Sequence, residues 1–231
     1  MNPSKPLRDD PESLFEEIES GESDISSVYA HFVKRLANRN WFSFWGPVTD
    51  GSCELCAMFL MDALLRQEKE VNLLICSGGG SEDDTRALLG IMELCKASGM
   101  VIRVYGAGCV ASAAFDIFSA CSQGYRFAFE VTMFMTHSSA GHVEDEDMYE
   151  LQKKFDMWTL KHYTNIHAAT RKRFMKTGNW WFDPEQAVEY GIADHVVKAG
   201  AVLPTGPIYP KRKTADEQKN EAARAAVGEE D

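Results

Sequence analysis

The stretch MVIRVYGAGCVASAAFDIFSAC, Met100–Cys121, decides the expected fold because glycines join an apolar run to an apolar helix. The run Met100–Tyr105 is typical of a buried strand. We expect a turn at Gly106-Ala107-Gly108 and a helix over Val110–Cys121. A strand, a turn and a helix in this order form the repeating unit of an α/β fold.

The same alternation is predicted on both sides of this unit. The expected strands are Trp41–Trp45, Val71–Cys76, Met100–Tyr105, Tyr125–Glu130, Thr132–Thr136 and Ala193–Val197. The expected helices are Ile25–Ala37, Cys53–Arg66, Asp83–Ala97, Val110–Cys121, Glu144–Met175 and Pro184–Tyr190. Strands that alternate with helices predict a largely parallel central sheet.

Charge and composition place one domain at the centre of the 231-residue chain. We predict an acidic, disordered segment over 1–25, a folded domain over 26–205 and a disordered tail over 206–231. The net charge of −11 gives no electrostatic basis for binding nucleic acid or anionic lipid. Residues 9–24 carry eight acids and no lysine or arginine, so the body is close to neutral.

Compartment and redox state follow from what the sequence lacks. It shows no secretory h-region and no run of about 18 apolar residues, so we expect a cytoplasmic protein. The six cysteines lie in apolar segments and are expected to stay reduced. Cys53 and Cys56 form a lone C-x-x-C without a second pair, so core packing is predicted and no metal.

Two glycine-rich turns offer candidate anion sites, because each follows a strand and opens a helix. The turn at Gly79-Gly80 presents backbone N–H groups suited to an oxyanion. Ser112 begins the helix after the second turn, and His137 ends a later strand. A serine needs a base within hydrogen-bond reach to act as a nucleophile, and His137 is the candidate.

The second turn also has a competing interpretation. Gly106-x-Gly108-x-x-Ala111 fits the dinucleotide fingerprint G-x-G-x-x-G/A, and Glu130 lies near the interval expected for a ribose-binding acid. An NAD-dependent oxidoreductase is therefore an alternative function. The fingerprint usually lies in the first strand–helix unit, whereas here another unit precedes it.

These motifs resemble, in order, those of the proteolytic subunit of the Clp protease (ClpP) and of ClpP-like proteases from phage gene clusters. The likeness covers residues 41–197 and preserves the family's 25-residue interval between Ser112 and His137. The segments that carry it are Phe44–Val48, Leu73–Gly80 (LLICSGGG), Gly108–Ser112 (GCVAS), Gly124–Phe127 (GYRF), Met133–His137 and Pro184–Ala193 (PEQAVEYGIA).

The resemblance implies a ClpP/crotonase-like fold, with repeated β-β-α units around a mainly parallel sheet, and a serine endopeptidase that needs no cofactor. Ser112 would be the nucleophile, His137 the general base, and the Gly80 and Ala113 N–H groups the oxyanion hole. The family assembles into rings, so self-association is expected. Partners implied are an AAA+ unfoldase or phage capsid proteins, and the substrate is peptide or unfolded protein.

Two features depart from the family or extend it. The family's third triad member, an aspartate, falls near Met175 or Lys176, where no carboxylate lies, and Asn179 and Asp183 are the nearest substitutes. The third member is therefore unknown, and a weak or inactive structural subunit is the alternative.

The helix predicted over Glu144–Met175 resembles the protruding handle that joins rings, and its apolar residues are expected to be buried between subunits.

Overall fold

A computed structural model describes residues 25–138, 145–174 and 178–201 of the chain. Seven strands form one sheet: β1 (Trp41–Trp45), β2 (Glu70–Ser77), β3 (Val101–Ala111), β4 (Arg126–Phe129), β5 (Met133–Thr136), β6 (Trp180–Phe182) and β7 (His195–Val197). The helices are α2 (Ile25–Ala37), α3 (Asp50–Leu65), α4 (Glu82–Ala97), α5 (Ala113–Ala120), α6 (Glu146–Tyr163), α7 (Ala168–Phe174) and α8 (Pro184–Glu189).

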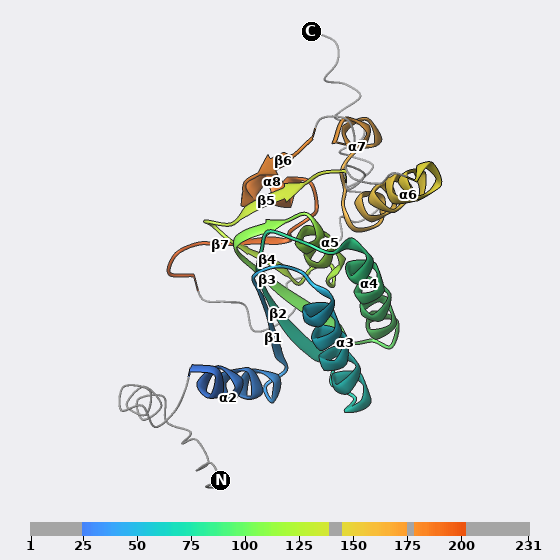
Figure 1. The fold of residues 1–231 in the computed structure, drawn as a ribbon. Coiled ribbons are helices and arrows are strands. Elements are labelled where there is room, and N and C mark those ends of the chain that lie inside the picture. Colours follow the sequence, from blue (N-terminus) through green and yellow to red (C-terminus); the bar gives the residue numbers. More distant parts are fainter. Residues whose placement is uncertain (1–24, 139–144, 175–177, 202–231) are drawn as a thin grey trace, which may run out of the picture.

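The sheet is parallel except at one end. Strands follow the order β1-β2-β3-β4-β7, and every pair along this path is parallel. β5 pairs with the second half of β3, and β6 pairs with β5 in the antiparallel sense. The predicted α/β fold with a mainly parallel sheet is confirmed (Figure 1).

Helices α3, α4 and α5 lie against one face of the sheet and enclose the main core (Figure 1). β2 shows how the sequence builds this side, because its residues alternate between buried and partly exposed. A smaller cluster lies on the other face, where aromatic rings from β1, β3, β4 and β7 stack at 4.8–5.3 Å between centroids. These rings belong to Trp41, Tyr105, Phe127 and His195.

The turn predicted at Gly106-Ala107-Gly108 is wrong, because β3 continues through it to Ala111. Gly106 is needed for packing, since a Cβ there would lie 3.0 Å from the Phe118 ring. Gly108 has φ +62°, a left-handed conformation that favours glycine. The glycines therefore let a long strand change partner from β4 to β5, and α5 begins only after Ser112.

The single long helix predicted over Glu144–Met175 is also wrong, since the described chain forms α6 and α7 instead. Thr164 adopts an extended conformation that ends α6. The next residue, Asn165, donates its backbone N–H to the Tyr190 carbonyl at 2.8 Å, and Ile166 enters the core. Tertiary contacts therefore stop the helix where its periodicity would continue.

β6 was not predicted from the sequence, because three residues give too short a period to detect. The predicted disordered segments lie almost wholly outside the described residues, so they stay predictions. None of the helices within the described ranges is long and apolar enough to cross a membrane.

A buried ion pair joins β4 to the turn before β7. Arg126 and Asp194 form two parallel hydrogen bonds of 2.9 and 2.7 Å, with side chains 3% and 9% exposed. The Asp194 carboxylate also accepts the Gly124 N–H, and the guanidinium donates to the Tyr163 carbonyl at 3.0 Å. A buried charge pair of this kind is tolerable because its remaining donors and acceptors are satisfied.

We therefore expect Asp194→Ala to lower the free energy of unfolding by about 3–5 kcal/mol, because it leaves the Arg126 charge buried and unpaired. Urea denaturation followed by circular dichroism measures the change. The control is Asp62→Ala, which removes the exposed partner of Arg66 and should cost about 0–1 kcal/mol. Equal losses in the two variants would contradict the role of burial.

Candidate active site

Ser112 lies at the junction between β3 and α5 in a strained conformation. Its φ of 55° and ψ of −128° fall outside the regions that L-residues favour. Such a conformation costs about 1–3 kcal/mol and persists only where neighbouring contacts impose it. Two of these contacts are backbone hydrogen bonds from Phe115 and Asp116 to the Ser112 carbonyl, which begin α5.

The strand register brings Ser112 to His137. β3 and β5 are parallel, with Ala111 opposite Met135, and the Ser112 N–H donates to the Met135 carbonyl at 2.9 Å. His137 follows two residues later, just beyond β5. The Ser112 Oγ lies 2.7 Å from the His137 Nε2, so the two predicted residues form a hydrogen bond. Both side chains are partly exposed, which leaves them accessible to a substrate.

The turn after β2 passes directly beside Ser112. A Cβ on Gly79 would lie 2.6 Å from both the Ala111 carbonyl oxygen and the Ser112 Cβ, closer than any side chain allows. A Cβ on Gly80 would lie 1.9 Å from the Val48 carbonyl oxygen. Both glycines also have positive φ. Only glycine therefore lets the ends of β2 and β3 approach one another here.

The predicted oxyanion donors are the backbone N–H groups of Gly80 and Ala113. Gly80 is in the turn after β2, and Ala113 begins α5, the two segments that approach one another here. The bridge to Val48 uses the Gly79 carbonyl and the Ser81 N–H, so the Gly80 N–H points to the opposite side of the strand. Ala113 is the first residue of α5, where N–H groups have no acceptor within the helix. Its nitrogen would be 3.1 Å from a Cβ on Gly79.

The dinucleotide interpretation loses its structural basis. The fingerprint Gly106-x-Gly108-x-x-Ala111 runs along β3 and forms no phosphate-binding turn. The Gly106 carbonyl accepts the Thr132 hydroxyl at 2.7 Å inside the fold. Glu130 is exposed beyond the end of β4.

The structure separates the two candidates for the third triad position. Asp183 caps α8, and its carboxylate accepts the Gln186 N–H at 2.8 Å, so it has a structural role. β6 pairs with β5 so that Trp180 lies opposite Thr136, and one further step in this register sets Asn179 opposite His137. Residues directly opposite in such a ladder have Cβ atoms about 4.5–5.5 Å apart. Met175 and Lys176 lie outside the described residues.

Two acids beside the Ser–His pair were missed in the sequence. Asp116 lies one helical turn after Ser112, and Asp156 of α6 accepts the Ser138 hydroxyl at 3.2 Å. A signal for Asp116 was available, since it is the only charged residue in Val110–Cys121. No sequence signal links Asp156 to the site, because only the packing of α6 brings it there.

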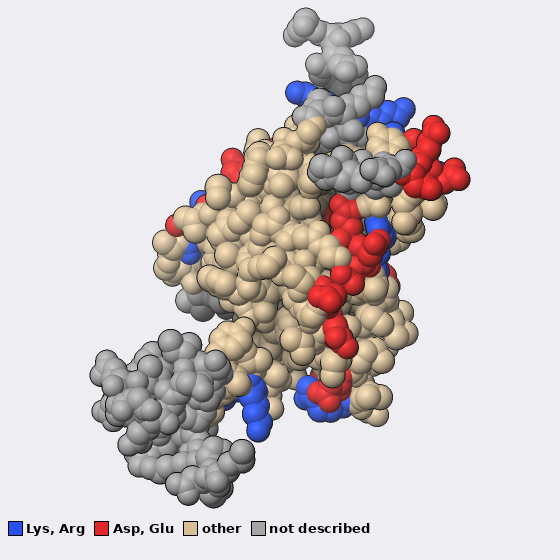
Figure 2. Space-filling view, in the orientation of Figure 1, with Lys and Arg blue, Asp and Glu red and all other residues tan. Residues whose placement is uncertain are grey.

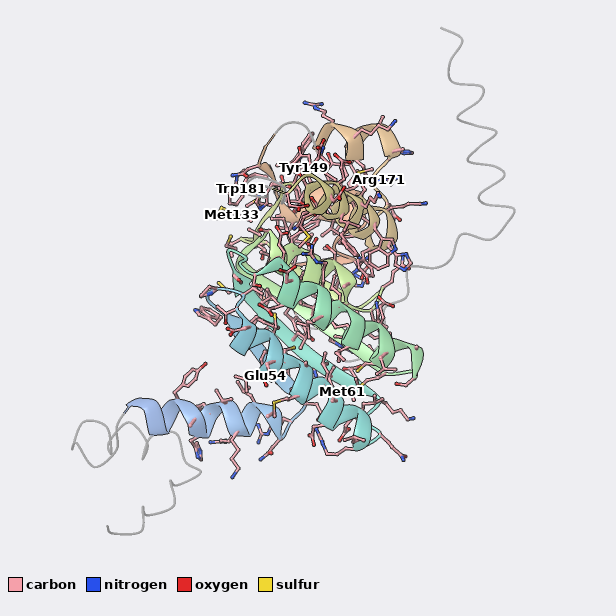
Figure 3. All side chains as sticks on the ribbon, turned by 45° about the vertical axis from the view of Figure 1, so that its right-hand side comes forward. Glu54, Met61, Met133, Tyr149, Arg171 and Trp181 are labelled. Atoms are coloured by element: carbon pink, nitrogen blue, oxygen red, sulfur yellow. The ribbon has the colours of Figure 1, made fainter. Side chains whose placement is uncertain are left out.

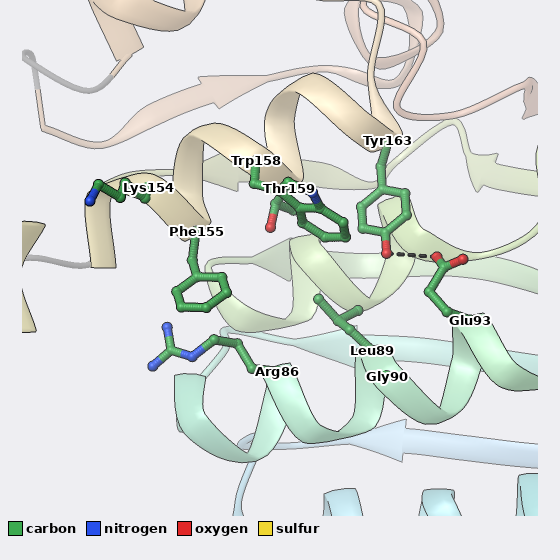
Figure 4. Close-up of a pocket in the computed structure, with 9 residues that line it drawn as sticks. All are labelled: Arg86, Leu89, Gly90, Glu93, Lys154, Phe155, Trp158, Thr159 and Tyr163. Atoms are coloured by element: carbon green, nitrogen blue, oxygen red, sulfur yellow. Dashed lines mark hydrogen bonds between the residues drawn. The ribbon is translucent and has the colours of Figure 1, made fainter. Parts of the chain in front are cut away.

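The other candidate sites do not share this chemistry. An apolar cavity of about 360 Å³ lies between α4 and α6, lined by residues such as Leu89, Phe155 and Trp158, and it includes neither Ser112 nor His137 (Figure 4). Within the described ranges, no cluster of three or more His, Cys, Asp or Glu is arranged to hold a metal.

The Cys53–Cys56 pair lies on the buried face of α3, as core packing predicts. Burial raises the pKa of the Cys53 thiol to about 11 and the pKa of Cys56 well above its usual value. Both thiols therefore stay protonated at neutral pH, which is unfavourable for metal binding or thiol exchange.

The curated proteins to which the chain is similar include proteolytic subunits of the Clp protease. Proteolytic subunit 4 of the ATP-dependent Clp protease, chloroplastic, from Arabidopsis thaliana is 29% identical over 171 residues, which cover 67% of this chain and 58% of that protein. Proteolytic subunit 2 from Mycolicibacterium paratuberculosis is 26% identical over 173 residues, which cover 68% of this chain and 81% of the relative.

Solved structures show the same fold. A ClpP1 mutant from Listeria monocytogenes matches with a TM-score of 0.65 and 19% identity, over 72% of this chain and 96% of its own. The ClpP protease catalytic domain from Plasmodium falciparum matches with a TM-score of 0.65 and 20% identity, over 75% and 93%. The family model described as Clp protease matches residues 24–200. Because that match spans most of the chain, the chain belongs to the Clp protease family.

Proposed function

We propose that the protein is a serine endopeptidase that cleaves peptide bonds through an acyl-enzyme. The observation that carries this proposal is the 2.7 Å hydrogen bond between Ser112 Oγ and His137 Nε2, at a strained strand-to-helix junction. Membership of the Clp protease family supports peptidase activity.

The geometry suits acyl transfer. His137 accepts the Ser112 hydroxyl proton at Nε2 while the oxygen attacks the peptide carbonyl. The N–H groups of Gly80 and Ala113 would hold the oxyanion that forms. His137 then delivers the proton to the departing amine, and the C–N bond breaks. Water, activated by the same imidazole, hydrolyses the Ser112 ester.

Asn179 takes the place of the usual triad aspartate in this proposal. Its amide oxygen can accept a hydrogen bond from the His137 Nδ1–H, which selects the tautomer that leaves Nε2 free for Ser112. Among the described residues Asn179 makes no side-chain hydrogen bond that would prevent this role. A neutral amide stabilises the imidazolium less than a carboxylate does, so we expect slow chemistry.

The alternative function is a structural subunit with little activity of its own. The same neutral Asn179 is the observation that favours it, since no described carboxylate is placed to orient His137. The two hypotheses differ in one property: an intact Ser–His pair reacts with a serine-directed probe, whereas an inactive subunit does not.

Self-association is the second part of the proposal. Helix α6 carries a row of large apolar side chains that are 44–48% exposed in the single chain: Met148, Leu151, Phe155 and Trp158. A second patch consists of the exposed side chains of Met133 in β5 and Trp181 in β6, which lie close together. It is at the opposite end of the molecule from Glu54 and Met61 of α3 (Figure 3). Apolar surfaces of this kind are typical of protein interfaces.

We infer that these surfaces are covered in a homo-oligomeric ring or barrel, which would place the active sites inside it. An AAA+ unfoldase would then deliver unfolded chain, or a phage capsid protein would itself be the substrate. The names of the curated relatives refer to an ATP-dependent protease, which agrees with an ATPase partner.

Wild-type protein should be labelled at Ser112 by a fluorophosphonate probe, because His137 activates that hydroxyl. Ser112→Ala should abolish labelling, and Ser119→Ala, a change at a buried hydroxyl on the same helix, should not. In-gel fluorescence and peptide mapping measure the result. Absence of labelling in the assembled wild type would favour the structural-subunit alternative.

Asn179→Asp should raise kcat/KM for a fluorogenic peptide by about 10-fold or more, because a carboxylate stabilises the imidazolium. Asn179→Ala should lower kcat/KM by about 10-fold, since the tautomer is no longer selected. Asp183→Asn keeps a capping side chain and serves as the control. If both Asn179 variants match wild type, Asn179 does not orient His137.

The double variant Met148→Glu/Leu151→Glu should shift the protein to smaller species, because it places charge in the apolar row of α6. Analytical ultracentrifugation measures the distribution of species. Lys161→Glu changes an exposed charge on the same helix and should leave assembly intact. Unchanged sedimentation of the double variant would exclude α6 from the interface.

A further inference from the structure

Two of the six cysteines differ from the other four in their surroundings. Cys76 near the end of β2 and Cys109 in β3 are partly exposed, and both are free thiols. The other four belong to the main core between the helices and the sheet: Cys53, Cys56, Cys95 and Cys121. Core packing accounts for these four and leaves the partly exposed pair unexplained.

Strand register places Cys76 and Cys109 opposite one another. β2 and β3 are parallel, and Ser77 pairs with Val110 just after the register shifts beyond Ile75. One step back along both strands from this pair sets Cys76 opposite Cys109. Neighbouring strands lie about 4.8 Å apart, and a disulfide joins Cα atoms that are about 4.4–6.8 Å apart. The spacing of the two strands therefore suits a disulfide.

The two side chains also point to the same face of the sheet. Ile75 and Val110 belong to the main core beneath the helices, and successive residues of a strand point to opposite faces. Cys76 and Cys109 therefore share the face away from α3, α4 and α5. The Cys76 sulfur lies 3.2 Å from the place that a Cβ on Gly108 would occupy. Because Gly108 directly precedes Cys109, the Cys76 thiol leans over β3 towards the second cysteine.

The two thiols are close enough for one to influence the ionisation of the other. Burial first, and then the charge of Cys76, raises the pKa of Cys109 above its usual value. A thiol reacts with an oxidant as the thiolate, so a raised pKa slows that reaction at neutral pH. We therefore expect both thiols to stay reduced until an oxidant persists.

The pair lies next to both halves of the proposed active site. Ser77 follows Cys76, and its hydroxyl accepts the Gly79 N–H at 3.1 Å, at the start of the oxyanion turn. Cys109 lies three residues before Ser112 on the same strand-to-helix segment. A change in the spacing of β2 and β3 at this point would therefore move Ser112 relative to the turn.

We propose that Cys76 and Cys109 form a redox-sensitive thiol pair, which peroxide oxidises to a disulfide that displaces Ser112 from the oxyanion turn. The bond itself does not depend on the proposed peptidase function, whereas its effect on cleavage rests on that function. A disulfide draws two Cβ atoms to about 3.8 Å, closer than the roughly 4.8 Å between neighbouring strands. A shift of about 1 Å at a catalytic site can lower its rate about 100-fold.

The reaction balances with peroxide as the oxidant. A thiolate sulfur attacks one peroxide oxygen, the O–O bond breaks, and a sulfenic acid forms. The second sulfur then displaces the hydroxyl group, so that an S–S bond forms and the S–O bond breaks. Two thiols and one hydrogen peroxide give one disulfide and two waters. The sulfurs lose two electrons, and the peroxide oxygens gain them.

The charge near the pair favours a small neutral oxidant. β2 leads through the glycine turn into α4, whose first turn holds Glu82, Asp83 and Asp84. Acidic side chains gather over the region where α4 begins and again where α6 begins (Figure 2). Repulsion by these acids disfavours anionic oxidants such as glutathione disulfide and does not act on hydrogen peroxide.

The test treats the full assembled chain with hydrogen peroxide at mildly alkaline pH, then unfolds it in urea and labels free thiols with N-ethylmaleimide. Peptide mapping by mass spectrometry should find Cys76 and Cys109 joined to each other and unlabelled. The four core cysteines of the same sample should be labelled, which provides an internal control. Cleavage of a fluorogenic peptide should fall by about 10- to 100-fold after oxidation and return with dithiothreitol.

Two variants connect the bond to the loss of activity. Cys76→Ser and Cys109→Ser should each keep the activity of reduced wild type and lose its sensitivity to peroxide. Either substitution removes the bond, so one variant that folds is sufficient. If the two cysteines only fill space as small apolar residues, both variants respond to peroxide as wild type does, and the switch is overturned.

The remaining outcomes separate the thiol pair from the proposed function. Labelling of Cys76 and Cys109 after peroxide treatment overturns the pair, as does a stable mixed disulfide when glutathione disulfide is added instead. A mapped bond with unchanged cleavage overturns the coupling to Ser112. A mapped bond in a chain whose reduced form neither cleaves peptide nor reacts with a fluorophosphonate supports the thiol pair and overturns the peptidase.

Discussion

The site depends on the absence of side chains at the two glycines after β2. Gly79 lies so close to Ser112 that a single methyl group would overlap it, and Gly80 is even closer to Val48. This approach holds the end of β2 against the junction of β3 and α5. It sets one amide beside the proposed nucleophile and helps to maintain the unfavourable φ of Ser112. The rest of the fold supplies the strands and helices that hold these two backbone segments in place.

Strand register provides the other half of the geometry. β3 changes partner from β4 to β5 along its length, and the β5 pairing sets His137 beside Ser112. β6 then continues the sheet in the opposite direction and carries Asn179 to the same position. Three segments distant in the sequence therefore meet because backbone hydrogen bonds align them. The Arg126–Asp194 pair fixes the neighbouring strands through charges that are buried and fully satisfied.

In the proposed site, charge and not backbone geometry distinguishes this chain from the pattern of its family. There, the neutral amide of Asn179 takes the orienting position, and an amide stabilises the imidazolium less than a carboxylate does. This feature affects charge and leaves the backbone unchanged, so a site of ordinary geometry would differ in rate. The net charge of −11 does not reveal this, because much of it lies in residues 9–24.

Local patterns in the sequence were sufficient for the alternation of strands and helices, for the parallel sheet and for the order of motifs around Ser112 and His137. These features depend on periodicity and spacing, which neighbouring residues encode. The pattern failed at Gly106–Gly108, because glycines that allow close packing look the same as glycines that make a turn. It also failed at Thr164, where contacts to Tyr190 and the core end a helix. The cross-strand position of Asn179 and the contact of Asp156 with Ser138 were decided only by the tertiary structure, because they require register and helix packing between segments that are far apart in the chain.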